Sequence, residues 1–133
     1  MTTEWTYRGQ IIDSPGEFYG FVYLITNKLS NKKYIGKKLF WSKKRKSVKG
    51  KSKRIVVESD WKTYWSSSED LKSDVKKLGE ENFTREILHL CPNKGTANYL
   101  EAKEQFINEV LEKRDMWYNS WIQCKIHYSH LKK

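Results

Sequence analysis

The clearest feature in the hydrophobic and polar pattern of this chain is a pair of short apolar runs between residues 20 and 38. The first run, FVYLIT at 21–26, is β-branched and aromatic, which suits a pleated and largely buried strand. Asparagine, serine and lysine interrupt the pattern at 27–32, as expected of a hairpin loop. The second run, KYIG at 33–36, ends in a glycine that permits close backbone approach. The pattern therefore predicts a β-hairpin.

Each arm of this hairpin carries a tyrosine, Tyr23 on the first and Tyr34 on the second. If Tyr23 pairs with Gly36, Tyr34 pairs with Ile25, and both phenols point to the same face as diagonal neighbours. A slip of one residue would place them on opposite faces. Simple packing of two buried tyrosines is the alternative to a chemical role.

The downstream pattern predicts four more elements, after an extended lead-in at 1–17 that packs on the core. They are a strand at 55–57, a helix that ends before Gly79, a strand at 83–90 and a helix from 96 to about 113. The first of these helices would begin at a loose capping box of Ser67 and Asp70 and bury Leu71, Val75 and Leu78. The order of elements predicts an α+β sandwich. We expect a small antiparallel or mixed three-stranded sheet, made from the hairpin plus one later strand and flanked by helices.

Two helical faces can be read in these segments. Trp61, Tyr64 and Trp65 have the spacing of one helical face, which favours core packing, with contact to nucleic-acid bases as the alternative. For the last helix we expect Thr96 to be the N-cap. Its apolar stripe would comprise Ala97, Leu100, Ala102, Phe106, Ile107, Val110 and Leu111.

The length of 133 residues predicts a single domain over 1–133, with a basic insertion at 37–58 and a C-terminal tail at 120–133. No apolar run is long enough to span a membrane. Cys91 and Cys124 are too few for a disulfide framework, and with the three histidines they match no zinc spacing. We therefore expect reduced thiols, no structural zinc and a cytoplasmic location.

The charge of the chain is concentrated in one block. The net charge is +10, and residues 37–54 contain ten lysines or arginines and no acidic residue, so the remainder is neutral overall. Such a block attracts a polyanion and makes its binding dependent on salt. The alternative is a solvated loop with no partner. We expect binding to nucleic acid through Lys37, Lys43, Lys44, Lys46, Lys49, Lys51, Lys53 and Arg54.

The hairpin resembles the core of the GIY-YIG nuclease family, which carries those two tripeptides on its two arms. The first appears here as Phe21-Val22-Tyr23 behind Gly20 and is degenerate, whereas Tyr34-Ile35-Gly36 is intact and is followed by Lys37. The resemblance covers about residues 19–120. It implies a Mg²⁺-dependent DNA endonuclease in which Tyr23 acts as the general base or relays to it, while Tyr34 orients the base or the water.

The resemblance also implies a metal ion, Mg²⁺ or Mn²⁺, held by a glutamate on the last helix. Glu101 sits in Leu100-Glu101, which is similar to the leucine–glutamate setting of the family. Glu104 lies between apolar positions and is the alternate, since a carboxylate there would need a partner. For either residue, pairing with a lysine at the helix surface is the simple alternative.

The family has an arginine where this chain has Lys44, in a region that reads as an extended basic loop or ribbon and not as a helix. The catalytic cation could therefore be Arg45, Lys44 or Arg54, with Lys37 and Lys38 as substitutes next to the motif. Asn119 is similar to the terminal asparagine of the family and would brace the site together with the structural glycine Gly36.

The resemblance implies double-stranded DNA as the partner, with a homo-oligomer as one route to double-strand cleavage. A compact nuclease of this type would suit a phage or a mobile element, such as a homing endonuclease, and would then act in the host cytoplasm. Two other classes stay open on composition alone: a catalytically inactive nucleic-acid binder that keeps the fold, and an RNA-binding protein whose aromatics and lysines imitate the motif.

Overall fold

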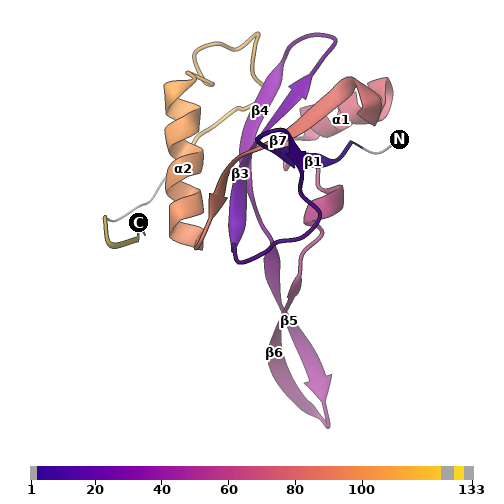
Figure 1. The fold of residues 1–133 in the computed structure, drawn as a ribbon, viewed down its shortest axis with the longest axis vertical. Helices are drawn as coiled ribbons and strands as arrows, with labels where there is room; N and C mark the ends of the chain where they lie inside the picture. The colour runs from indigo at the N-terminus through magenta and orange to yellow at the C-terminus, as the bar shows by residue number, and fades with distance from the viewer. Residues whose placement is uncertain (1–2, 124–127, 131–133) are drawn as a thin grey trace.

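The computed structural model describes residues 3–123 and 128–130, and the ribbon in Figure 1 shows their arrangement. Seven strands are formed: β1 Trp5–Tyr7, β2 Gln10–Ile11, β3 Gly20–Asn27, β4 Lys33–Leu39, β5 Trp41–Val48, β6 Lys51–Glu58 and β7 Phe83–Cys91. The helices are α1 Glu69–Leu78 and α2 Lys94–Ile107, with short 3-10 turns at Trp61–Thr63, Glu80–Asn82 and Tyr128–His130. No helix among the described residues is long and apolar enough to cross a membrane.

The main sheet has five strands in the order β2-β1-β7-β3-β4. The predicted hairpin and the later strand form one side of it, with β3 antiparallel to both β7 and the edge strand β4. The lead-in adds the other two, because β1 pairs in parallel with β7 and in antiparallel with β2. The mixed sheet with its helices confirms the α+β class, and the sheet is two strands wider than the hairpin and later strand alone.

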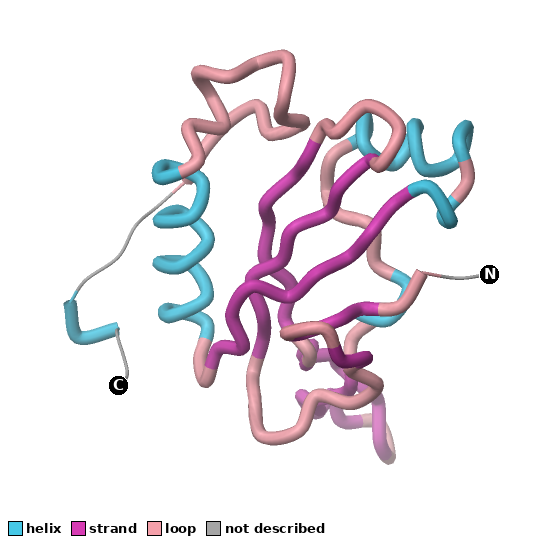
Figure 2. The backbone as a smooth tube through the Cα atoms, turned by 45° about the horizontal axis from the view of Figure 1, so that its top comes forward, coloured by secondary structure: helices cyan, strands magenta, loops and turns pink. Residues whose placement is uncertain are grey.

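The sheet separates two hydrophobic clusters. Phe21, Tyr23 and Ile25 alternate along β3 toward the cluster that contains Leu71 and Val75 of α1. Val22 points to the other face, where a second cluster contains Ala97 of α2. Figures 1 and 2 show the two helices on opposite sides of the sheet. Tyr23 therefore lies in the α1 layer of a three-layer molecule.

Helix α1 begins one residue later than the predicted cap implies, because the Ser68 hydroxyl, and not that of Ser67, accepts the Leu71 amide and caps the helix. Helix α2 corrects two predictions. Its N-cap is Asn93, whose side chain accepts the Thr96 amide at 2.7 Å, so Thr96 is not the cap. The helix also ends at Ile107 and not near 113.

The apolar stripe of α2 was predicted too broadly. Phe106 and Ile107 are 62% and 64% exposed, because the helix ends there and the chain turns away. Gln105 is buried in their place. The aromatic segment at 61–65 also forms only a 3-10 turn, so the predicted helical face of Trp61, Tyr64 and Trp65 is wrong, although Trp61 is fully buried.

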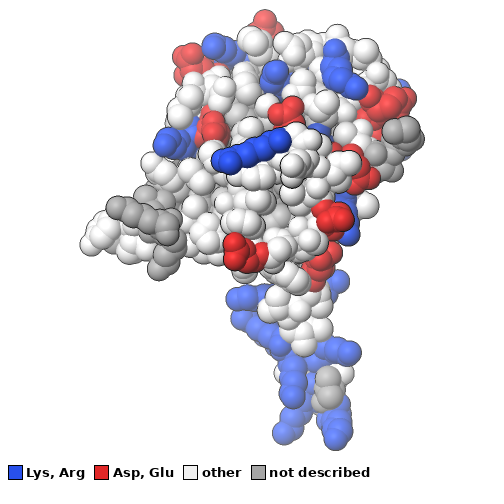
Figure 3. Space-filling model, viewed as in Figure 1, with Lys and Arg blue, Asp and Glu red and all other residues white. Residues whose placement is uncertain are grey.

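The basic segment forms an isolated two-stranded ribbon, β5–β6, that projects away from the main sheet (Figure 1). Figure 3 shows Lys and Arg gathered along this projection, whereas both signs of charge mix over the body. Lys43, Lys44, Arg45, Lys46, Lys51, Lys53 and Arg54 lie on its strands with exposed side chains, and Lys49 is at its turn.

Candidate active site

A cleft of about 740 Å³ opens beside the hairpin β3–β4. Its walls come from the N-terminus of α1, from α2 and from the segment after α2. Five residues singled out from the sequence line it together: Tyr23, Tyr34, Lys37, Glu101 and Asn119. The fold thus gathers the two motif tyrosines, a cation, a carboxylate and an amide in one hollow.

The hairpin register places the two tyrosines on the same face of the sheet. Tyr23 pairs with Gly36 and Tyr34 with Ile25, which is one of the two registers that the sequence left open. The two rings are stacked, with centroids 6.1 Å apart and planes inclined by 29°. A third tyrosine, Tyr64, meets Tyr23 edge-on with centroids 6.1 Å apart.

Gly36 leaves the space that the Tyr23 ring occupies. A Cβ atom at this position would lie 2.4 Å from Tyr23 Oη and 2.7 Å from Tyr23 Cζ. It would also lie 2.8 Å from Tyr34 Cε1. The motif glycine is therefore required by the close approach of both phenol rings and not by a special backbone angle.

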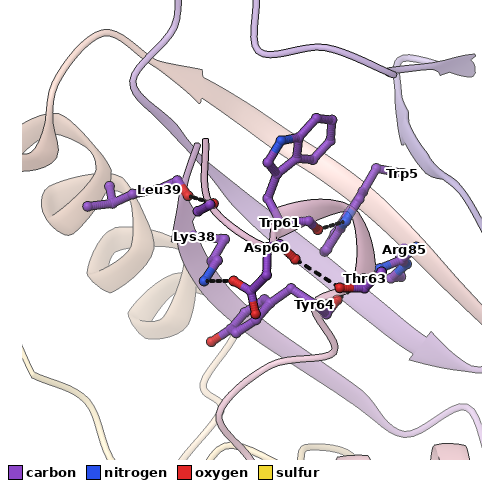
Figure 4. Close-up of polar contacts among 9 residues, drawn as sticks. Trp5, Lys38, Leu39, Asp60, Trp61, Thr63, Tyr64 and Arg85 are labelled. Carbon is purple, nitrogen blue, oxygen red and sulfur yellow. Dashed lines mark hydrogen bonds and ion pairs between the residues drawn. The ribbon is translucent and has the colours of Figure 1, made fainter. Parts of the chain in front are cut away.

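Burial raises the pKa of Tyr23 well above its usual value, and the neighbouring Tyr34, Tyr64 and Glu101 raise it further. This shift favours the neutral phenol of Tyr23 over the phenolate. Lys38 is engaged elsewhere: its Nζ lies 2.7 Å from Asp60 and 4.2 Å from the centre of the Tyr64 ring (Figure 4).

Hydroxyl groups link the tyrosines to their surroundings. The Tyr23 hydroxyl hydrogen-bonds to Tyr64. Tyr34 Oη lies 3.2 Å from Ser67 Oγ, just before the N-terminus of α1. Burial raises the pKa of Tyr34 and of Tyr64 as well. The site thus presents neutral phenols whose oxygens can accept or donate a hydrogen bond.

Glu101 and Glu104 have different surroundings. Glu101 lines the cleft, and burial raises its pKa, an effect that the Lys37 charge and the Lys37 backbone amide oppose. Glu104 lies 2.7 Å from His89 Nε2 and does not line the cleft. Of the two carboxylates, Glu101 is the one next to the tyrosines.

A Mg²⁺ ion fits this donor set. Among the described residues no group of three or more His, Cys, Asp or Glu side chains could hold a metal ion. Mg²⁺ does not need one, because it keeps several waters and binds through one or two carboxylates plus substrate phosphates. Glu101 offers one such carboxylate on the wall of an open, water-accessible cleft.

The cations of the cleft are not those that the sequence favoured. Lys37, Lys94 and Arg114 line it, whereas Arg45, Lys44 and Arg54 lie on the projecting ribbon. Arg114 donates to the carbonyl oxygens of Val110 and Asn119. Sequence reasoning missed Arg114, and its nearness to Asn119 in the chain is the signal that could have found it.

Asn119 braces the second motif strand. Its Oδ1 accepts the Ile35 amide at 3.1 Å, and its Nδ2 donates to the Ile35 carbonyl at 2.7 Å. Gln105, which sequence reasoning also missed, donates to the same carbonyl at 2.9 Å. Because Ile35 lies between Tyr34 and Gly36, these bonds hold the motif strand in place.

Comparison with known families gives one finding. A family model described as "Putative endonuclease segE, GIY-YIG domain" matches residues 5–122, which is most of the chain. Neither the curated proteins nor the solved structures gave a match. The matched range includes the hairpin, the ribbon, both helices and the bracing asparagine.

Proposed function

Because the chain belongs to the SegE family of GIY-YIG endonucleases, we propose that it hydrolyses phosphodiester bonds of double-stranded DNA in the cleft, with one divalent ion held by Glu101. The observation that carries this proposal is the gathering of Tyr23, Tyr34 and Glu101 around one hollow. When bound there, Mg²⁺ or Mn²⁺ would lower the pKa of a water molecule and neutralise charge on the phosphate.

The tyrosines would position the attacking water. Tyr23 is buried and neutral, and its hydroxyl is already oriented by Tyr64. Tyr34 is oriented by Ser67. Two fixed phenol oxygens beside a carboxylate can hold a water molecule in line for attack. Tyr23 can take up the proton of this water as it passes its own proton to Tyr64, and Tyr64, which lines the cleft, releases its own proton to solvent. Of the two roles that the resemblance implies for Tyr23, its neutral phenol thus favours the relay over the base.

The charge on the phosphoryl oxygens would be neutralised from within the cleft. Lys37 follows the motif glycine directly and faces Glu101, and Arg114 also lines the cleft. Positioned cations of this kind stabilise the charge that develops in the transition state. We assign this role to Lys37 and Arg114, and we assign Arg45, Lys44 and Arg54 to DNA binding.

The test is cleavage of a supercoiled plasmid with and without Mg²⁺, followed on a gel. Glu101→Gln keeps the shape of the side chain and removes its charge, so we expect cleavage to be abolished while DNA binding persists. Glu104→Gln is the matched control three residues further along α2, and we expect it to cleave. Cleavage by Glu101→Gln at the wild-type rate would refute the metal role.

A protein that binds DNA without cutting it is the second candidate, and the lysine-rich ribbon is the observation that favours it. Plasmid that stays intact with both Mg²⁺ and Mn²⁺, while a gel shift shows binding, would establish this alternative. Two further properties remain predictions. Assembly into a homo-oligomer can be measured by sedimentation of the DNA complex, and a location in the host cytoplasm can be measured by imaging of the expressed protein.

A further inference from the structure

The ribbon β5–β6 has like charges directly opposite each other on its two strands. Arg45 pairs with Arg54, and the next rung pairs Lys46 with Lys53. Like charges opposite one another destabilise an antiparallel pair. An isolated two-stranded ribbon is already marginal in water. The ribbon is therefore built at a cost in stability, and a polyanion is the partner that would remove this cost.

The two faces of the ribbon carry different chemistry. Opposed residues share a face and successive rungs alternate, so Arg45 and Arg54 share one face with Ser47 and Ser52, two rungs away. The alternate rungs belong to the other face, which carries the lysines Lys44, Lys46, Lys51 and Lys53, whereas the arginine face carries one lysine, Lys43. Flexible lysine is a point charge, whereas planar arginine donates two parallel hydrogen bonds. One face is thus suited to specific recognition and the other to phosphate attraction.

The stem of the ribbon is fixed to the body of the protein. The Ser59 amide donates to the Phe40 carbonyl at 2.7 Å, and the Ser59 hydroxyl donates to the Leu39 carbonyl at 2.6 Å. Phe40 is fully buried against Trp61, with ring centroids 4.9 Å apart. Figure 4 shows this anchorage around Leu39 and Trp61. Since β4 runs directly into the stem, the ribbon is held in a set position relative to the motif strand.

We propose that the ribbon enters the major groove of the DNA and selects the cleavage site, with Arg45 and Arg54 reading guanines. This inference rests on the proposed function. The major groove admits a two-stranded β-ribbon, and arginine bound bidentately to guanine O6 and N7 is the commonest specific contact there. The lysines of the other face would then reach the phosphates on either side of the groove. Eight-residue strands rise by roughly 25 Å, enough to follow the groove past several base pairs.

Double-stranded RNA does not suit the same ribbon. Its major groove is deep and too narrow for side chains to read. The minor groove of DNA is about 6 Å wide, so a ribbon enters it only where the duplex is deformed, and it offers a degenerate pattern of donors and acceptors. The observations therefore favour one partner, duplex DNA, and one groove.

The first test measures base preference without any cleavage. The wild-type protein is mixed with a library of DNA duplexes of random sequence in the presence of a metal chelator. The duplexes that it binds are recovered and sequenced. We expect guanine preference at defined positions. The double variant Arg45→Lys with Arg54→Lys keeps the charge and removes the bidentate contacts, so its preference should fall about tenfold or more at those positions.

A matched control alters the other face. Lys46→Gln with Lys53→Gln should weaken binding to all sequences alike, with the guanine preference kept. The salt slope should fall by about 0.9 for each phosphate that the variant no longer neutralises. A wild-type protein without base preference would overturn the proposal. So would an arginine double variant that retains the preference.

The groove is tested by methylation interference with dimethyl sulfate, which modifies guanine N7 in the major groove and adenine N3 in the minor groove. Interference at guanine N7 supports the assignment, and interference confined to adenine N3 overturns it. The assignment would also be overturned if duplex RNA competed for the protein as well as duplex DNA does. Because no metal ion or cleavage is involved, a failure here leaves the nuclease proposal standing, and an inactive enzyme leaves the groove assignment standing.

Discussion

Replacing Gly36 by alanine tests whether the position of the Tyr23 ring controls catalysis. The added Cβ atom would lie 2.4 Å from Tyr23 Oη, so the ring must move by about 1 Å to reach an ordinary contact of 3.4 Å. It cannot retreat freely, because Trp5 packs on it at 5.2 Å between centroids and only 1% of the residue is exposed. Overpacking of this kind costs about 1–3 kcal/mol.

We therefore expect two effects of Gly36→Ala. The melting temperature should fall by about 4–12 °C, which is the shift that such a destabilisation gives in a domain of this size. Cleavage by the folded protein should fall about a hundredfold, because a misplacement of about 1 Å can cost that much. Plasmid nicking under single-turnover conditions well below the melting temperature measures the second effect, and calorimetry measures the first.

Gly20→Ala provides the matched control on the same strand pair. Its Cβ would meet the Lys38 carbonyl oxygen and Leu39 Cδ2 at 2.9 Å, so it overpacks the hairpin away from the tyrosine hydroxyls. We expect a similar decrease in stability with nearly normal cleavage. The reasoning is refuted if Gly36→Ala cleaves as fast as the wild type, or if cleavage falls equally in both variants.

Contacts around the cleft lead to three further predictions. Tyr23→Phe should change stability by at most about 1 kcal/mol and slow cleavage about a hundredfold; a fast variant in a nicking assay would exclude the relay. Asn119→Ala should cost about 1–3 kcal/mol in urea unfolding, because the Ile35 amide is left without its acceptor; Asn119→Asp should not recover this, because it buries a charge and sets a second oxygen against the Ile35 carbonyl where Nδ2 now donates, so recovery by Asn119→Asp would contradict the assignment. The Tyr118 hydroxyl donates to Asp74 at 2.6 Å, and burial raises its pKa to about 12. A raised pKa stabilises the fold below the unfolded value near 10, so the stability advantage of wild type over Tyr118→Phe should shrink between about pH 10 and 12; an advantage that does not change with pH would contradict this.

The parts of the fold that could be predicted depend on local patterns. The alternation along 21–26 and the glycine after Tyr34-Ile35 were enough to predict the hairpin, although they left open the register in which Tyr23 pairs with Gly36. The stripe of Leu71, Val75 and Leu78 before Gly79 marks α1 in the same way, although the cap is Ser68 and not Ser67. These features are visible because neighbours in sequence determine them.

The rest depends on partners far along the chain. Nothing near Trp5 indicates that β1 will pair with Arg85 on β7, and nothing near Ile35 indicates that Gln105 and Asn119 will brace it. The register of β3 and β7 also shifts by one residue between Val22 and Tyr23, which a local pattern does not indicate. Of the cleft cations, Lys37 was named from the sequence because it follows the motif glycine, whereas Arg114, which shares a segment with Asn119, was missed.

The closely spaced ends of the ribbon have a consequence for how such a protein can diversify. The chain leaves the body at Phe40 and returns at Ser59, where a 2.7 Å hydrogen bond joins the two points. When the two ends of an insertion lie side by side, the entropic cost of closing the loop rises only slowly with the length of the insertion. The whole ribbon could therefore be exchanged for another of different length or sequence without disturbing the hairpin, the helices or the cleft. Target choice and bond cleavage would then evolve as separate, interchangeable modules of one small domain.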